Sequence, residues 1–229
     1  MLVTLLNFTT EPEKTVALAA KLCYSDSDIP QLEERVKGLS YERFLGKILK
    51  MGHLSVLEHA SFTFGIEGIT RVTSHQLVRH RLASYSQQSQ RYVAFREGFE
   101  YVIPPSIQEK AELKNRFSKM VGSIHRFYRE LLKAGILAED ARYIFPNATA
   151  TKIIVTMNAR ELLHFFSLRC CERAQWEMRE MAKRMLRLVK KEAPTIFAKA
   201  GPGCIRGGCP EGEMTCGRPD EIREEFKKL

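Results

Sequence analysis

The order of apolar and polar residues along the chain predicts several amphipathic helices and a few short strands. Apolar residues that recur every three to four positions indicate helices, whereas strict alternation, as from Ala60 through Phe62 and Phe64 to Ile66, indicates a half-buried strand. Asn158 is a helix-capping residue type and is expected to open the last long helix. The predicted helices are 17–24, 41–51, 70–82, 106–135, 138–143 and 160–191, and the predicted strands are 60–66, 89–101 and 151–157.

Two apolar stripes at helical spacing are expected to face the core. In the predicted helix 106–135 the stripe consists of Leu113, Phe117, Met120, Ile124, Phe127 and Leu131. In the predicted helix 160–191 it consists of Met178, Met181, Met185 and Leu188. The Arg and Lys residues on the other face of the second helix are expected to be solvated. In the predicted helix 70–82, Gln76, Arg79 and His80 share one face.

The predicted elements favour one α+β domain over residues 1–200, with long helices packed on a small, mainly antiparallel sheet. A chain of 229 residues is long enough for one substantial core. Residues 201–229 hold six of the 14 Gly, three of the nine Pro and three of the six Cys, and are interpreted as an appended tail. No stretch has the length and apolarity of a membrane span, and the first residues lack the pattern of a signal peptide, so a cytoplasmic protein is expected.

The formal net charge of +9 is concentrated in a window without acidic residues. Between residues 68 and 96 there is no Asp, Glu or Lys, while five Arg and two His occur. Arg recognises phosphates and planar anions through a forked set of donors, so the window indicates defined anion recognition. An RNA-binding protein with an arginine-rich surface is the alternative, because Tyr85 and Tyr92 are interleaved with the arginines and the pI is about 9.3.

The run RHRLASYSQQSQRY, residues 79–92, is the strongest candidate for chemistry. The chain has no phosphate-binding glycine loop, no dinucleotide fingerprint, no H-E-x-x-H and no G-x-S-x-G motif. Phosphates must therefore be held by side chains. The run supplies hydroxyl and amide groups between its terminal arginines, which suits both the phosphate and the base edge of a nucleotide.

The three cysteines of the tail, Cys204, Cys209 and Cys216, allow a second alternative, a metal or redox module. Their spacing supplies only three ligands and lacks the close C-x2-C pairs of common zinc sites. We therefore expect no metal, and the alternative explains the tail only.

The motif Arg79-His80-Arg81, followed by seven residues and Ser89, resembles the signature of the flavin-dependent thymidylate synthases. Three further blocks in the same order strengthen the resemblance: GHLSVLEHASFTF at 52–64, the segment 142–146, and NARELLHFFSLRCCERAQWE at 158–177. The resemblance implies a homotetramer that methylates deoxyuridylate (dUMP) to thymidylate (dTMP). It also implies FAD as cofactor, NADPH and 5,10-methylenetetrahydrofolate as co-substrates, and no nucleic-acid partner.

The resemblance also implies roles for individual residues. The implied FAD-binding residues are Ser55, Arg79, His80, Arg81, Gln87, Asn158, Ala159, Arg160 and His164. The implied dUMP-binding residues are Gln76, Arg79, Gln87, Gln88, Ser89, Gln90, Arg91, Arg142 and Arg169. Arg169 is also the expected catalytic residue, because a guanidinium beside the uracil ring favours loss of a ring proton.

Simple chemistry separates the expected roles within this set. Arg91 and Arg142 suit the nucleotide phosphate, which accepts two parallel hydrogen bonds from one guanidinium. Ser89 is expected to bind and orient the nucleotide, because a serine nucleophile needs an adjacent base and residues 84–91 contain none.

The sequence departs from the family pattern at two positions. Gln87 stands where some members carry Glu, and His164 stands where Asn also occurs. His53 has two interpretations, a residue at the flavin and folate mouth or a loop residue with a local hydrogen bond. Cys170, Cys171 and the cysteines of the tail have no part in the family pattern.

Overall fold

The computed structural model describes residues 1–229, which divide into two compact units. The first unit comprises residues 1–2, 66–79 and 85–154. The second unit comprises residues 3–65, 80–84 and 155–229. The chain therefore passes from one unit to the other several times.

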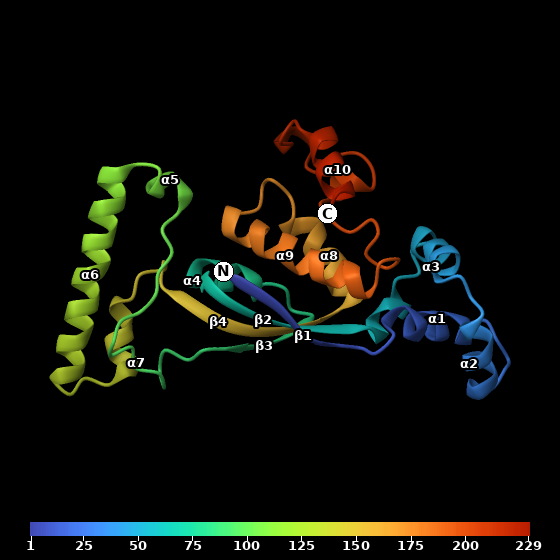
Figure 1. Ribbon diagram of the computed structural model, residues 1–229, viewed down its shortest axis with the longest axis horizontal. Helices are drawn as coiled ribbons and strands as arrows, with labels where there is room; N and C mark the ends of the chain where they lie inside the picture. Colours follow the sequence, from blue (N-terminus) through green and yellow to red (C-terminus); the bar gives the residue numbers. More distant parts are fainter. The chain divides into compact units, whose positions relative to one another are not determined.

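A four-stranded antiparallel sheet confirms the α+β class predicted from the sequence (Figure 1). Its strand order is β1-β2-β4-β3. The bounds are β1 Leu2–Phe8, β2 Ser61–Thr70, β3 Ala83–Gln87 and β4 Ala150–Asn158. The predicted strands 60–66 and 151–157 are confirmed as β2 and β4, and Phe62 and Phe64 of β2 and Val155 of β4 are fully buried.

The second unit packs its helices around an aromatic core. Phe62 of β2 meets Phe197 edge to face, with ring centroids 5.5 Å apart, and Phe197 also contacts Phe166. The stripe of Met178, Met181 and Met185 is buried as predicted. The helices of this unit are α1 Pro12–Leu22, α2 Ile29–Lys37, α3 Tyr41–Lys50, α8 Ala159–Arg169, α9 Trp176–Glu192 and α10 Pro219–Lys227, with the 3-10 turns η1 Ser55–His59, η3 Gly203–Ile205 and η4 Gly212–Met214.

The first unit is dominated by one long helix, α6. Its buried residues are Val121 and Tyr128, and the Tyr128 ring lies 4.6 Å from that of Phe145. The other helices of the unit are α4 Arg71–Leu77, α5 Pro105–Gln108, α6 Ala111–Lys133 and α7 Ala138–Ala141, with the 3-10 turn η2 Arg142–Ile144. Gly135 ends α6 as expected, with a φ of 84°.

The apolar stripe of α6 does not form the core that its periodicity predicted. Leu113, Met120 and Phe127 are 42%, 65% and 50% exposed. Their spacing of seven residues places them on one face of α6. Helical periodicity identifies the apolar face of a helix but does not identify what covers it.

Three predicted elements were wrong in extent. The helix 70–82 ends at Leu77, so Arg79 and His80 lie beyond it and do not share a helix face with Gln76. The strand 89–101 does not form, and β3 at Ala83–Gln87 takes its place in the sheet. The helix 160–191 is interrupted after Arg169.

The interruption after Arg169 has a local cause. A turn follows Arg169, and the Gln175 side chain then caps α9 by accepting a hydrogen bond from the Met178 amide at 3.0 Å. Strand β1 and helix α2 were not predicted.

No helix of the structure combines the length and apolarity required to cross a membrane.

Candidate functional site

A buried chain of hydrogen bonds links three side chains of the second unit. His80 Nδ1 lies 2.9 Å from Glu161 Oε1, and both residues are only 5% exposed. On the other side of the ring, Arg169 Nε donates to His80 Nε2 at 3.0 Å. Glu161 and Arg169 stand in the first and last turns of α8. The helix therefore fixes the two charged groups that flank the imidazole.

The partners of His80 determine where its proton lies. A guanidinium has donors and no acceptor, so His80 Nε2 must accept and the ring proton must sit on Nδ1, which donates to Glu161. Burial lowers the pKa of His80, and the positive charge of Arg169 acts in the same direction against the opposing effect of Glu161. His80 is therefore neutral at neutral pH, and it bridges a carboxylate and a guanidinium.

The start of α8 uses two of the predicted flavin residues for its own structure. The Asn158 side chain caps the helix by accepting from the Glu161 amide at 2.9 Å. Ala159 is fully buried, and its amide donates to the Ala60 carbonyl at 2.7 Å. The predicted start at Asn158 is thus confirmed, and it orients the whole helix.

The other predicted flavin residues of the second unit are exposed. Arg160 Nη1 lies 2.5 Å from Glu58 Oε1, and the two residues form an ion pair. Arg81 is exposed and forms no ion pair. His164 is exposed, with its ring centroid 5.8 Å from that of His80. Ser55 is exposed at the start of η1.

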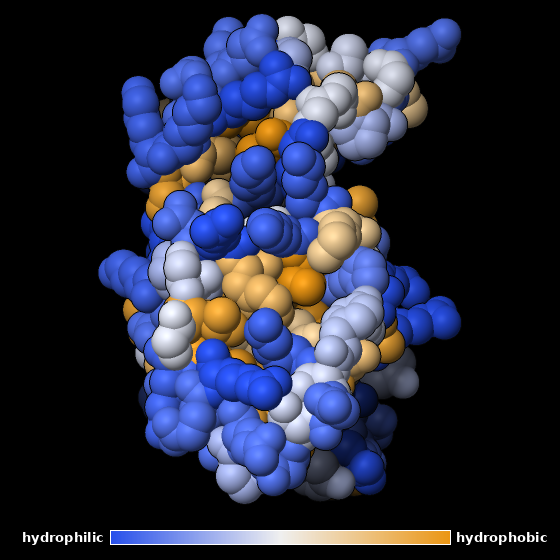
Figure 2. All heavy atoms as spheres, turned by 90° about the vertical axis from the view of Figure 1, so that its right-hand side faces the viewer, coloured by the Kyte–Doolittle hydropathy of each residue, from blue (hydrophilic) through white to orange (hydrophobic).

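His53 has a partner of its own in the second unit. Its Nδ1 lies 3.2 Å from the Tyr24 hydroxyl, and both residues are exposed. Figure 2 shows the face of the molecule over α1, α2 and α3, where apolar atoms gather between hydrophilic ones. Leu22, Tyr24 and Met51, 49%, 74% and 60% exposed, are among the exposed apolar residues of this region.

Hydroxyl and amide groups of the first unit shape the segment after β3. Ser89 Oγ accepts from the amides of Arg91 and Tyr92, at 3.1 and 3.3 Å, and so forms a local turn. Gln87 Nε2 donates to the Thr151 hydroxyl at 3.2 Å, and the Gln88 amide donates to the Lys152 carbonyl at 2.9 Å.

Gln90 differs from its neighbours in this segment. Its side-chain Nε2 is buried and has no hydrogen-bond partner. A buried donor without an acceptor costs about 1–3 kcal/mol, so this amide is suited to an acceptor supplied by a ligand.

Arginines gather near this segment in the first unit. Arg91 pairs with Glu139 and lies over the Tyr92 ring, 5.3 Å from its centroid. Arg142 Nε donates to the Glu139 carbonyl at 3.0 Å. Burial lowers the pKa of Arg71, and the positive charge of Arg142 acts in the same direction.

Arg71 is not among the site residues predicted from the sequence. Its only signal was its place in the acid-free window. The positive charges of Arg71 and Arg142 create positive potential that a bound anion would relieve. Of the other predicted dUMP residues in this unit, Gln76 is half-buried in α4, and Arg79 is exposed and forms no ion pair within the described chain.

Comparison with known proteins identifies the family. Residues 4–195 match the family described as thymidylate synthase complementing protein. A flavin-dependent thymidylate synthase of Geobacter sulfurreducens is 57% identical over 230 residues, which cover 100% of this chain and 99% of the relative. This chain belongs to the flavin-dependent thymidylate synthase family. Enzymes of that name from Clostridium tetani and Pyrococcus abyssi are each 48% identical, over 98% and 99% of this chain and 96% and 97% of the relatives.

Family membership confirms the resemblance drawn from the RHR motif. The RHR motif is divided between the two units. Arg79 belongs to the first unit, and His80 and Arg81 belong to the second. Most predicted nucleotide residues belong to the first unit, and most predicted flavin residues belong to the second.

Proposed function

We propose that the protein methylates dUMP to dTMP, with 5,10-methylenetetrahydrofolate as carbon donor and FAD reduced by NADPH. The observation that carries the proposal is the full-length match, at 57% identity, to a relative named flavin-dependent thymidylate synthase. The family match over residues 4–195 also supports a synthase domain at 1–200 followed by a tail at 201–229. Six cysteines without a disulfide fit the expected cytoplasmic setting.

The arginines of the first unit are proposed to hold the dUMP phosphate. Arg71, Arg91 and Arg142 supply forked donors, and the positive charges of Arg71 and Arg142 favour an anion in this region. The buried, unpartnered amide of Gln90 is proposed to donate to a uracil carbonyl or a sugar hydroxyl. Ser89 supports the turn that presents Gln90 and Arg91, so its role is orientation.

The remaining dUMP residues are proposed from the family resemblance. Gln76, Arg79, Gln87 and Gln88 complete the set, and the hydrogen bond from Gln87 to Thr151 fixes one of them against β4. Gln87 is also retained as a flavin contact.

Exposed cationic and polar groups fit FAD. Arg79 and Arg81 are exposed guanidiniums without an ion pair, which suits the diphosphate of the cofactor. Ser55, Arg160 and His164 present exposed polar groups, while Asn158 and Ala159 set the start of α8. His80 is proposed to support the site from its buried position. When bound, FAD supplies the hydride chemistry, and the protein supplies position and charge.

Arg169 is proposed as the catalytic residue. The hydrogen bond to the buried His80 ring holds its Nε, and the Glu161 carboxylate anchors His80 in turn. A guanidinium held in this way stabilises negative charge that develops on the uracil ring, without reorganising during the reaction.

The exposed apolar face of α6 supports the proposed homotetramer. Leu113, Met120 and Phe127 form a stripe that the isolated chain leaves in solvent. Exposed apolar stripes of this kind mark surfaces that a second chain covers.

Purified protein tests the proposed function directly. We expect a yellow protein that releases FAD on denaturation and forms dTMP only with methylenetetrahydrofolate and a reductant. Arg169→Ala should abolish turnover and retain FAD, whereas Ser89→Ala should weaken dUMP binding and retain activity. Protein that stays inactive and flavin-free after reconstitution with FAD contradicts the proposal. Colourless protein that binds RNA at physiological salt favours the RNA-binding alternative.

A further inference from the structure

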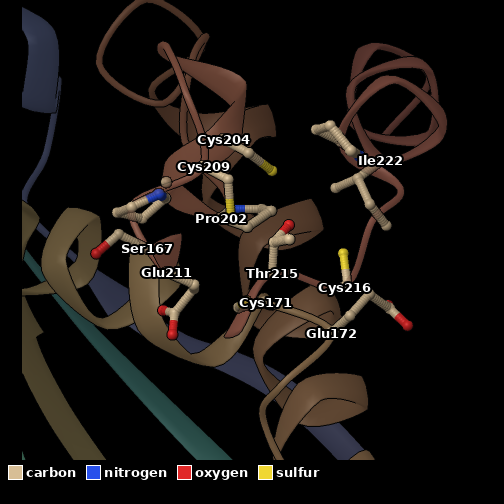
Figure 3. A pocket seen from close by; sticks show the side chains of 13 residues that line it. Ser167, Cys171, Glu172, Pro202, Cys204, Cys209, Glu211, Thr215, Cys216 and Ile222 are labelled. Atoms are coloured by element: carbon tan, nitrogen blue, oxygen red, sulfur yellow. The ribbon is translucent and has the colours of Figure 1, made fainter. Parts of the chain in front are cut away.

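Four of the six cysteines line one pocket of the second unit. Cys204, Cys209 and Cys216 come from the tail, and Cys171 comes from the turn between α8 and α9 (Figure 3). None of the four forms a disulfide. The pocket has mainly apolar walls, which include Pro202, Pro210 and Ile222.

The fold supplies the ligand that the sequence lacked. The spacing of the tail cysteines offers three sulfurs, one fewer than a closed tetrahedral site requires. Cys171 adds the fourth from a distant part of the chain. Four thiolates are a complete ligand set for a thiophilic divalent cation such as Zn²⁺.

The segment 201–218 has little regular secondary structure, and the Arg223 side chain holds part of its backbone by donating to the Cys204 and Gly207 carbonyls. Residues 201–218 contain only two 3-10 turns of three residues each, and Cys204 is among the few buried side chains. Ion pairs of Arg173 with Glu211 and of Arg218 with Glu172 join the tail to the α8–α9 turn. A short segment with a small core usually needs a metal or disulfide to fix it.

We propose that Cys171, Cys204, Cys209 and Cys216 bind one divalent cation of the zinc class, which fastens the tail to the α8–α9 turn. No three His, Cys, Asp or Glu side chains yet converge closely enough to enclose an ion, so binding must draw the sulfurs together. Binding converts four thiols to thiolates, releases their protons and changes no oxidation state.

Metal analysis of the full-length protein tests the site. Protein purified without chelator, or refolded with ZnSO4 and desalted, should contain about one zinc per chain. Replacement of zinc by Co²⁺ should give the sulfur-to-cobalt charge-transfer absorption of a tetrathiolate site. Cys204→Ser and Cys216→Ser should each lose most of the bound metal. Cys23→Ser is the matched control, because Cys23 is exposed at the end of α1 and outside the pocket. It should retain the metal.

The outcomes separate this site from the proposed enzyme. Protein without zinc after reconstitution, or Cys216→Ser protein with full zinc content, overturns the proposal. Peptide mapping of unreduced protein that finds two of these cysteines in a disulfide, with no metal bound, overturns it in favour of a redox pair. Flavin content and dTMP formation are measured on the same samples. A zinc-free active enzyme would refute the metal site alone, and an inactive zinc protein would refute the proposed function alone.

Discussion

The buried partner of His80 provides the sharpest test of the site. In Glu161→Ala, the His80 Nδ1 proton loses its acceptor, and residues 80 and 161 both remain buried in the second unit. In Glu161→Gln, the side-chain oxygen can still accept that hydrogen bond but carries no charge. The two variants therefore separate the hydrogen bond from the charge.

The expected magnitudes follow from burial. An unsatisfied buried donor costs about 1–3 kcal/mol, and a hydrogen bond to a charged group contributes about 1.5–3 kcal/mol. We expect Glu161→Ala to lower the free energy of unfolding by about 2–3 kcal/mol and Glu161→Gln by about 1 kcal/mol. If Arg169 acts as proposed, loss of its support through His80 should lower kcat about tenfold in Glu161→Ala, equivalent to about 1.4 kcal/mol.

The pH dependence has a definite sign. Because burial lowers the pKa of His80 below the value of the unfolded chain, the unfolded chain takes up the proton first as pH falls. The contribution of neutral His80 to the free energy of unfolding is therefore fully present above about pH 6.5. It declines as the pH falls below that value. Glu161 raises the pKa of His80, so removal of its charge lowers that pKa further and extends the decline. The stability gap between wild type and Glu161→Gln should be wider at a pH below the pKa of His80 in the folded protein than at pH 7.5.

Urea denaturation at both pH values, at one protein concentration, measures these changes. Glu58→Gln is the control, because Glu58 forms an exposed ion pair with Arg160 and such pairs contribute only about 0–1 kcal/mol. Its effect should be small. Glu161→Ala protein as stable as wild type at both pH values, or a Glu161→Gln gap that does not change with pH, would refute the reasoning.

Three further predictions concern other parts of the chain. Glu13 accepts from the Thr195 amide at 2.5 Å, the Thr195 hydroxyl at 3.0 Å and the Ile196 amide at 3.2 Å, so Glu13→Ala should lower the free energy of unfolding by about 2–3 kcal/mol in urea denaturation. An unchanged midpoint would contradict this. Burial raises the pKa of Cys170 to about 12, so iodoacetamide at pH 8 should modify exposed Cys23 and leave Cys170 intact by mass spectrometry. Equal labelling of both would show that Cys170 is accessible. Phe127→Asp should reduce the size of the assembly in gel filtration, whereas Lys119→Glu on the exposed surface of the same helix should not. An intact Phe127→Asp assembly would place the interface elsewhere.

Local patterns predicted many elements because they reflect local geometry. The alternation in 60–66 identified β2, since side chains of a strand point to opposite faces in turn. The β-branched residues of 151–157 identified β4, because such side chains favour extended backbone. Asn158 marked the start of α8, because a capping side chain bonds to an amide three residues away.

One error occurred where a distant part of the chain decides the pairing, and another where a turn is formed by residues that also suit a helix. Segment 89–101 is rich in strand-forming residues but does not join the sheet, because β3 is the strand that pairs with the free edge of β4. The helical pattern through 160–191 did not reveal the turn after Arg169, because the turn residues themselves can form a helix.

The sequence by itself determined the RHR motif, the acid-free window and the family, because these depend only on residue identity and order. The tertiary structure alone placed Glu161 beside His80, 81 residues earlier in the chain, and Arg71 near Arg142. It alone added Cys171 to the cysteines of the tail. Such groupings follow the path of the folded backbone, and spacing along the sequence does not encode that path.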